Sequence, residues 1–312
     1  MNIVAPVAGI DVSKDELVIS VDGGKPLRFA NSQQGCSALI QVIGDKGTVH
    51  LESSGGYERL VRRRSQEAGL KVVVHNPLKP RRMAQAKGRK AKTDPVDARA
   101  LSEWGPLLPE GSLRNLERQQ LADYSRAIQT LKQMGADLKQ QLDRPELDED
   151  ARRLYTEALL DLEKRIRLAE KGLHKRLCNS AFGDGYKLVQ SVPAVGRITA
   201  AIVICELPED YMDRTGAQIG SYAGMAPIDD SSGKRTGRSR IGHGNSRLKA
   251  AFYMPAICAV RSQPWARDLY ARLRSEGRSH QSAIVAVMRR LLIRVHAVLK
   301  RGSAWEAEPP KA

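Results

Sequence analysis

The chain has 312 residues, of which 41% are hydrophobic, so it is long enough to form two domains that each bury a core. Its 51 lysines and arginines outnumber its 35 aspartates and glutamates, and the formal charge of +16 predicts a polyanionic partner such as nucleic acid. No apolar stretch is long enough to span a bilayer and no signal peptide is visible, so we expect a cytoplasmic protein with no membrane partner. The 4 cysteines form no C-x-x-C pair, which argues against a disulfide framework or a zinc site.

Residues 1–108 predict an α/β domain. Apolar patterns indicate strands at 7–12, 16–21 and 26–30, which would form an antiparallel meander. Later patterns predict a helix at 35–44, a strand at 48–52, a helix at 57–68 and a strand at 71–75. A three-strand meander followed by alternating strands and helices indicates an RNase H-like fold.

Four carboxylates in this domain predict a metal site. Asp11 lies in the first strand, and Glu52 closes a later one. Asp94 is a good helix N-cap, Pro95 fits the first helical position, and Asp97 then lies one turn on, on the same face. Grouped acids repel one another unless a hard cation lies between them, and oxygen ligands favour Mg²⁺ or Mn²⁺. Such sites serve phosphoryl transfer, where metals stabilise the attacking and leaving oxygens.

A basic stretch precedes the two aspartates. Basic side chains beside an acidic metal site suit a phosphodiester substrate, and a solvated polar loop is the alternative interpretation. The residues that we expect to contact nucleic acid here are Arg81, Arg82, Lys87, Arg89, Lys90 and Lys92.

Residues 109–182 predict a long helical connector, because leucines, glutamines and alternating charges dominate and glycines are few. Pro145 would break a single rod, so we expect two long helices. The leucine spacing is irregular for strict heptads. Coiled-coil pairing with another protomer and an intrachain hairpin therefore both stay open.

Residues 183–302 predict a mainly helical C-terminal domain, followed by a frayed tail at 303–312. Residues 191–200 resemble the turn of a helix-hairpin-helix unit, in which the second helix offers backbone amides to a phosphate. The match is weak because Ala194 stands where glycine is usual.

A serine beside Gly233 is a candidate nucleophile, because the arginines and lysines around it in the sequence could hold the attacked phosphate. Taken alone, Ser-Ser-Gly is a common loop signal. The further residues that we expect to contact nucleic acid are Lys234, Arg235, Arg238, Arg240, His243, Asn245 and Arg247.

The motifs of both halves occur in the order seen in one family. They are Asp11-Val12-Ser13-Lys14, Glu52-Ser53-Ser54-Gly55-Gly56-Tyr57-Glu58, Lys92-Thr93-Asp94-Pro95-Val96-Asp97-Ala98, 193–200, 223–227, Ser232-Gly233 and Gly244-Asn245-Ser246-Arg247-Leu248. Over nearly its whole length the chain resembles the DEDD transposases of bacterial insertion sequences, in insertion-sequence family one-ten, which are related to Piv-type DNA invertases. Its departures include Ala194 and Gly242, where the family commonly has a lysine.

The resemblance implies a RuvC-like N-terminal domain whose four acids bind Mg²⁺, with Mn²⁺ as a substitute, and a C-terminal transposase domain with Ser232 as nucleophile. It also implies an oligomerising connector and a structured noncoding bridge RNA that pairs with donor and target DNA. We expect a covalent phosphoserine intermediate whose phosphate charge Arg235, Arg238 and Arg240 stabilise. We further expect a homodimer that assembles into a tetramer on two DNAs in the bacterial nucleoid.

Two other functions compete with this one. A metal-dependent RuvC-like nuclease or Holliday-junction resolvase would use the acids to activate water, and would leave Ser232 as a loop residue. A nonenzymatic nucleic-acid-binding scaffold would explain the charge and the helices, but it leaves the clustered acids without a purpose.

Overall fold

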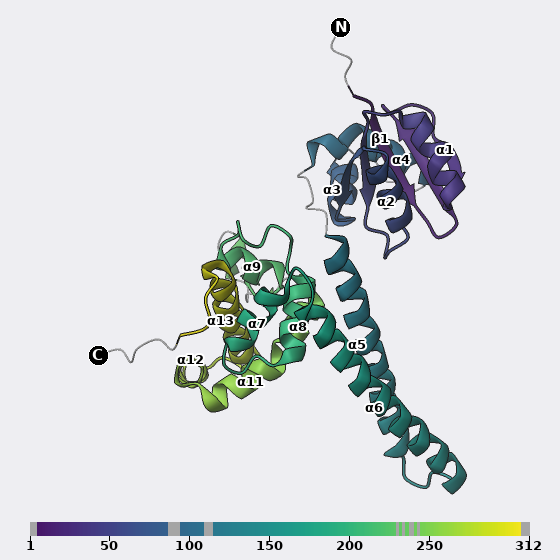
Figure 1. Ribbon diagram of the computed structural model, residues 1–312. Coiled ribbons are helices and arrows are strands. Elements are labelled where there is room, and N and C mark those ends of the chain that lie inside the picture. Colours follow the sequence, from purple (N-terminus) through teal and green to yellow (C-terminus); the bar gives the residue numbers. More distant parts are fainter. Residues whose placement is uncertain are drawn as a thin grey trace. The chain divides into compact units, whose positions relative to one another are not determined.

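The computed structural model describes residues 5–86, 94–108, 115–228, 231–232, 235–236, 240–241 and 244–306. The chain divides into two compact units, Met1–Leu113 and Arg114–Ala312 (Figure 1). In the described part of the chain, no helix combines the length and the apolar character needed to cross a membrane.

The N-terminal unit is built on a five-stranded mixed sheet in the order β3-β2-β1-β4-β5. Strands β1, β2 and β3 pair antiparallel, whereas β4 pairs parallel with both β1 and β5. The predicted meander and the later strands are therefore confirmed. The strands are β1 (Val7–Val12), β2 (Glu16–Val21), β3 (Leu27–Ala30), β4 (Thr48–Glu52) and β5 (Lys71–His75).

Helices cover both faces of this sheet (Figure 1). On one face, Ile10 and Leu51 pack in a core with Leu39 of α1 and Val61 of α2. The other face is covered by α4, which contacts β1, β2 and β4 and carries α3 against it. The helices of this unit are α1 (Gln33–Ile43), α2 (Arg59–Glu67), α3 (Leu78–Ala86), α4 (Asp94–Trp104) and the short 3₁₀ helix η1 (Gly105–Leu107).

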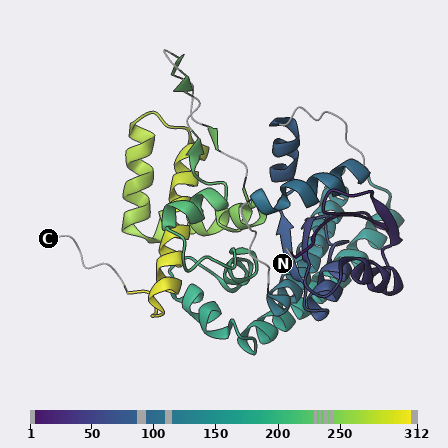
Figure 2. The ribbon, with the colours of Figure 1, turned by 90° about the horizontal axis from the view of Figure 1, so that it is seen from above.

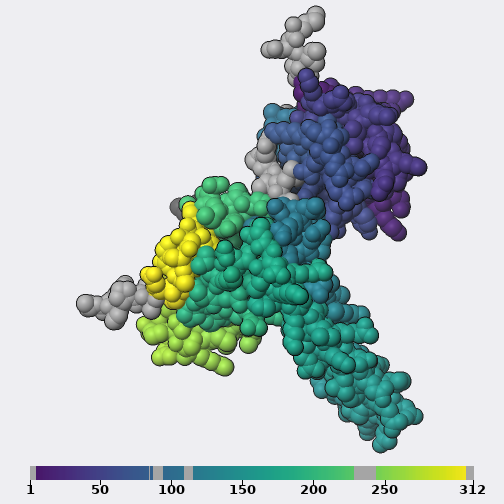
Figure 3. Space-filling model, viewed as in Figure 1, coloured from purple at the N-terminus to yellow at the C-terminus, as the bar shows by residue number. Residues whose placement is uncertain are grey.

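Two long antiparallel helices, α5 (Leu116–Leu142) and α6 (Glu149–Cys178), open the C-terminal unit. Each begins at a side-chain cap, since Asn115 and Asp148 accept hydrogen bonds from the backbone amides that follow them. The break falls around Pro145, as its ring predicts, and the intrachain hairpin is formed. In the space-filling view this teal hairpin extends as a rod from the remainder of its unit (Figure 3).

The hairpin is continuous with the helices that follow it, because α5 packs on α8 and contributes Leu121, Ala122 and Ile128 to their common core. Helix α8 is central, with every residue from Thr199 to Glu206 buried. The long α13 packs against α7, α9, α11 and α12. These helices are α7 (Gly183–Ser191), α8 (Arg197–Glu206), α9 (Gly216–Tyr222), α10 (Ser246–Ala251), α11 (Tyr253–Ser262), α12 (Pro264–Ser275) and α13 (His280–Arg301).

Four very short strands lie between α9 and α10 and extend from the helical body (Figure 2). Strand β6 (Pro227–Ile228) pairs with β9 (Arg240–Ile241), and β7 (Ser231–Ser232) pairs with β8 (Arg235–Thr236), both antiparallel. The β7–β8 ladder is nested in sequence within the β6–β9 ladder. We call residues 225–244, of which the structure describes 225–228, 231–232, 235–236, 240–241 and 244, the serine arm.

Candidate functional site

The carboxyl ends of β1 and β4 place Asp11 beside Glu52. In the parallel ladder Ile10 pairs with Leu51, so the next step along the two strands carries the two acids. Side chains alternate along a strand, and Ile10 and Leu51 face the core beneath α1 and α2. Asp11 and Glu52 therefore belong to the opposite face, where both are half-buried.

Helix α4 packs directly on this second face at Gly9. A Cβ atom built on Gly9 would come within 2.2 Å of both the Ala98 carbonyl oxygen and the Ser102 amide nitrogen. Only glycine permits so close an approach of helix and strand backbones. Because Gly9 and Asp11 are two residues apart, Asp11 shares the side of the sheet that α4 covers.

The direction of α4 carries Asp94 and Asp97 toward the same edge. In its last turns, the Ser102 hydroxyl accepts a hydrogen bond of 3.1 Å from the amide of Gly23, which lies just past β2 at the amino end of β1. The first turn of α4 therefore extends toward the carboxyl end of β1. Asp97 is half-buried there and Asp94 is exposed.

Carboxylate oxygens are the ligands that Mg²⁺ and Mn²⁺ prefer, so the chemistry of the four acids suits either ion. Asp11, Glu52 and Asp97 each have an interaction within the fold. Among the described residues, no three or more His, Cys, Asp or Glu side chains come close enough together to hold a metal ion. A cation bound between neighbouring carboxylates would offset their repulsion.

Glu58, a residue of the second motif, braces the loop that follows Glu52. Its Oε2 atom accepts hydrogen bonds from the Ser54 amide at 3.1 Å, the Ser54 hydroxyl at 3.0 Å and the Gly56 amide at 2.8 Å. Burial raises the pKa of the Glu58 carboxyl, but these hydrogen bonds outweigh burial and the pKa is lowered from its usual value. The ionised carboxylate therefore holds the turn that ends β4.

Asn31 ties the two strand-end loops together. Its amide nitrogen donates to the Ser13 carbonyl at 2.9 Å and to the Tyr57 carbonyl at 3.1 Å. Ser13 follows β1 and Tyr57 belongs to the loop after β4. Sequence reasoning missed this residue, and its only local signal was a position just before the N-cap of α1.

A buried histidine pair lies beneath the acidic edge. His50 Nδ1 and His75 Nε2 are 2.9 Å apart, and the two rings stack with their centroids 5.2 Å apart. In the ladder His75 pairs with Glu52 itself. The histidines are far apart in sequence and showed no paired spacing, and parallel pairing of β4 with β5 brings them together.

The structure describes only part of the basic stretch that precedes Asp94. Arg81 and Arg82 are exposed on α3. Several of the predicted nucleic-acid contacts lie outside the described residues: Lys87, Arg89, Lys90, Lys92, Lys234, Arg238 and His243.

Ser232 lies in the inner ladder of the serine arm, where it pairs with Arg235, while Arg240 pairs with Ile228 in the outer ladder. At the base of the arm, a Cβ atom on Gly244 would come within 2.2 Å of the Gly224 nitrogen, so the two ends of the arm touch. The backbone on the two sides of the serine arm, at Gly224 and Gly244, is therefore held side by side.

Asn245 and Arg247 make contacts inside the fold. The Asn245 side chain caps α10 by accepting from the Leu248 amide at 3.0 Å. Arg247 forms an ion pair with Glu206, its Nη1 lying 2.6 Å from Oε1. Glu206 was not singled out from the sequence, because a lone glutamate at the end of an apolar helix carries no local signal.

The turn between α7 and α8 contains the residue at which the sequence departs from a helix-hairpin-helix unit. Ala194 adopts a φ of 69°, in the left-handed region that favours glycine. Gly196 is the N-cap of α8 and has no side chain with which to cap it. Alanine therefore holds at position 194 a backbone conformation that glycine adopts more easily.

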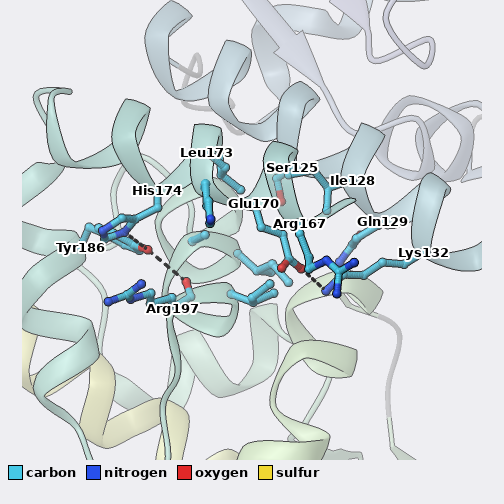
Figure 4. Close-up of a pocket in the computed structure, with 14 residues that line it drawn as sticks. Ser125, Ile128, Gln129, Lys132, Arg167, Glu170, Leu173, His174, Tyr186 and Arg197 are labelled. Atoms are coloured by element: carbon cyan, nitrogen blue, oxygen red, sulfur yellow. Dashed lines mark hydrogen bonds and ion pairs between the residues drawn. The ribbon is translucent and has the colours of Figure 1, made fainter. Parts of the chain in front are cut away.

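A cavity of about 320 Å³ opens between α5, α6, α7 and α8 (Figure 4). Tyr186 lies at one side, where its hydroxyl is 3.0 Å from His174 Nδ1, and Lys132 pairs with Glu170 at the other. Burial is the main cause that raises the pKa of Tyr186 to about 12. The lining is largely apolar. Its cationic residues are Lys132, Arg167, Lys171 and Arg197, and its carboxylate is Glu170.

Known protein families match both the N-terminal and the C-terminal part of the chain. Residues 186–271 match the family described as "Transposase IS116/IS110/IS902 family". Residues 8–145 match a second family, described as "Transposase", which comprises the DEDD transposases of IS110. The chain belongs to this transposase family. The membership predicted from the ordered motifs is thereby confirmed.

Relatives of the family cover the chain to different extents. A "Pilin gene-inverting protein" of Moraxella bovis is 25% identical over 96% of this chain and 97% of its own length. A protein of insertion element IS110 from Streptomyces coelicolor is 32% identical over 39% of this chain and 31% of its own length. A protein of insertion element IS900 from Mycobacterium paratuberculosis is 31% identical over 36% of this chain. Membership makes the chain a DNA transposition or recombination enzyme whose substrate is DNA.

Proposed function

We propose that the chain is an RNA-guided transposase that cuts and rejoins donor and target DNA through a covalent phosphoserine at Ser232. Mg²⁺ would be held by Asp11, Glu52, Asp94 and Asp97. The observation that carries the proposal is the ladder step that sets Asp11 beside Glu52, with the first turn of α4 directed toward the same edge. Family membership supports the same assignment.

The strand order supports a RuvC-like, RNase H-like N-terminal domain. An antiparallel meander of β1 to β3 is followed by parallel β4 and β5 in the order β3-β2-β1-β4-β5. This order sets β1 at the centre of the sheet. The acids at the carboxyl ends of β1 and β4 are then adjacent, and a helix covering that face can supply the remaining two.

In the proposed reaction the Ser232 hydroxyl oxygen attacks the phosphorus of one DNA linkage. The bond from phosphorus to the 3′-oxygen breaks, the serine loses its proton and the leaving oxygen gains one. A bound divalent cation would polarise the scissile phosphate and stabilise the leaving oxygen. Because one phosphoester replaces another, strands can be exchanged and rejoined without ATP. Arg235 and Arg240 of the arm, with Arg238, are proposed to stabilise the charge on the phosphate.

Positive charge supports a nucleic-acid partner that is bound through its backbone. The chain carries a formal charge of +16 and only 4% aromatic residues, so few side chains can stack on bases. Base pairing by a guide RNA would then select the DNA sequence. Arg81 and Arg82 offer exposed cations on α3. We also propose that the residues of the predicted basic stretches bind the DNA and RNA backbones.

The α5–α6 hairpin supports assembly into a dimer and then a tetramer. Large apolar side chains on it are exposed, which is costly in water unless another surface covers them. A second copy of the chain is the proposed cover. The exposed residues are Met134, Leu154, Leu160 and Leu168.

The deciding experiment looks for protein–DNA adducts on a denaturing gel with labelled substrate DNA and the copurified RNA. The wild-type chain should form an adduct that requires Mg²⁺, and Asp11→Asn should bind DNA but form none. Ser232→Ala should also form none, whereas the matched Ser231→Ala should keep it. If Ser232→Ala cleaves DNA at the wild-type rate, the serine mechanism is wrong and the water-activating nuclease or resolvase replaces it. Sequencing the copurified RNA tests the guide.

A further inference from the structure

The two ends of the serine arm meet at one buried residue of α8, Glu206. Its side chain is 3% exposed. Its backbone carbonyl accepts a hydrogen bond of 3.1 Å from the hydroxyl of Tyr222, which precedes the arm. Its carboxylate Oε2 accepts one of 3.0 Å from the side-chain nitrogen of Asn245, which follows the arm. A single residue thus contacts the chain on both sides of the arm.

The backbone closes the same base. The Asn245 amide donates to the Tyr222 carbonyl at 2.8 Å, directly linking the residues at the two ends. Gly224 and Gly244 touch without room for a side chain between them. The contacts to Glu206 and this backbone pairing therefore hold the base of the arm together.

The contacts continue to α5 through Arg247. Besides its ion pair with Glu206, Arg247 donates through Nε to Gln129 at 2.9 Å and through Nη2 to Ser125 at 3.4 Å. Arg126 of α5 also approaches Glu206, at 3.5 Å. Ser125 and Gln129 line the cavity of Figure 4. The arm is therefore connected to the long hairpin as well as to α8.

Buried carboxylates carry a large desolvation penalty and commonly add little net stability, so such a group is better explained by the geometry it specifies. Here the two polar atoms of the Asn245 side chain make different hydrogen bonds. Its oxygen caps α10 and its nitrogen binds Glu206. The orientation of the amide is thereby defined, and the direction in which the chain leaves the arm is defined with it.

We propose that Glu206 is a positioning residue for DNA cleavage, clamping both ends of the serine arm so that Ser232 is presented in one orientation. This inference rests on the proposed role of Ser232, because an arm without a nucleophile needs no such orientation. Glu206 itself does not touch the substrate. Its effect is expected on the rate of the chemical step and not on DNA affinity.

Glu206→Gln is the direct test. The glutamine keeps the volume, but its NH₂ group would face the NH₂ group of Asn245, whose oxygen is engaged at α10. Hydrogen exchange of the β6 to β9 amides in the free protein should accelerate about tenfold, the effect of one lost hydrogen bond to a charged group. The adduct rate should fall by about the same factor while DNA affinity stays within about twofold.

Asn245→Asp is a second variant, in case Glu206→Gln does not fold. Aspartate caps a helix as well as asparagine does, but it removes the donor to Glu206 and sets two carboxylates together. Tyr186→Phe is the matched control for Tyr222→Phe, since each loses one hydroxyl of the C-terminal unit and only Tyr222 flanks the arm. Arm exchange should accelerate in Asn245→Asp and Tyr222→Phe and stay unchanged in Tyr186→Phe.

Two readouts separate this clamp from the serine chemistry. Unchanged arm exchange in folded Glu206→Gln or Asn245→Asp overturns the clamp, and so does a loss of DNA affinity in Glu206→Gln that accounts for the whole loss of rate. Faster exchange at the arm, with exchange at α13 unchanged and a slower adduct, supports it. A wild-type chain that forms no adduct overturns the proposed function, while the exchange experiment still shows whether Glu206 holds the arm.

Discussion

Gly9 lies so close to Ala98 that a single added methyl group would come within 2.2 Å of the Ala98 carbonyl oxygen. This contact between β1 and α4 sets the spacing of the edge at which Asp11 and Asp97 lie. A glycine inside a strand normally weakens the strand, and here it permits the helix to approach. Close packing of the two backbones therefore determines how near the acidic helix lies to the sheet.

Gly9→Ala should force α4 away from β1. We expect it to lower the free energy of unfolding by about 1–3 kcal/mol, the typical cost of overpacking, and to reduce adduct formation further than stability alone explains. Urea unfolding followed by circular dichroism measures the first effect. Gly135→Ala on α5 is the control, because its Cβ would meet Leu162 at an ordinary 3.7 Å and alanine favours a helix. Equal stability of Gly9→Ala and wild type would contradict the close contact.

Glu58→Gln should loosen the loop after Glu52. Losing the ionised acceptor of the Ser54 and Gly56 bonds should cost about 1–3 kcal/mol at neutral pH. The lowered pKa of Glu58 means that its contribution is present above the usual glutamate pKa and is lost as pH falls through the folded-state value. Unfolding at a series of pH values should show the wild type losing this advantage over the variant in acid.

Glu67→Gln is the matched control for that experiment. Glu67 is the last residue of α2, the helix that follows Glu58, but it is 52% exposed and pairs with surface arginines, an arrangement that contributes little to stability. A Glu67→Gln variant that is as destabilised as Glu58→Gln would show that the loop bonds are not the cause.

The hydroxyl of Tyr186 should lose its proton at a higher pH than an ordinary tyrosine. With its pKa raised to about 12 mainly by burial, the folded state holds this proton while the unfolded state releases it near the ordinary value of 10.0. The stability from Tyr186 is therefore complete below the ordinary pKa and is lost as pH rises through the folded-state value. An absorbance titration of tyrosinate should contain a late step that Tyr186→Phe removes and that Tyr253→Phe, which removes an exposed tyrosine, retains. A late step that persists in Tyr186→Phe contradicts the assignment.

Arg118→Met should destabilise the C-terminal unit. The guanidinium is buried, donates to the Leu207 carbonyl at 3.3 Å, lies 3.6 Å from Glu209 and stacks 4.6 Å from the Phe182 ring centre. Removing one partner of such a buried group is expected to cost about 3–5 kcal/mol, visible as a lower thermal midpoint. Arg153→Met, at an exposed position of α6, should leave the midpoint unchanged. A midpoint for Arg118→Met that equals the wild-type value would contradict this role.

The sequence by itself determined the elements and the family. Alternation of apolar residues placed the strands of the N-terminal unit, Pro145 separated the two long helices, and the ordered acidic and Ser-Gly motifs identified the transposases, because these signals are local or follow the chain. The sequence also placed Asp11 in the first strand and Glu52 at the end of a later one, whereas the parallel register that makes them neighbours came from the structure.

Only the tertiary structure decided which distant residues meet. His50 with His75, Asn31 with Tyr57, and Glu206 with Asn245 are each far apart along the chain and carry no spacing pattern. Their contacts arise from parallel strand pairing, from loops meeting at a sheet edge and from an arm that returns to its own base. Such contacts depend on how whole helices and strands pack together, and a short stretch of sequence carries no pattern that predicts this packing.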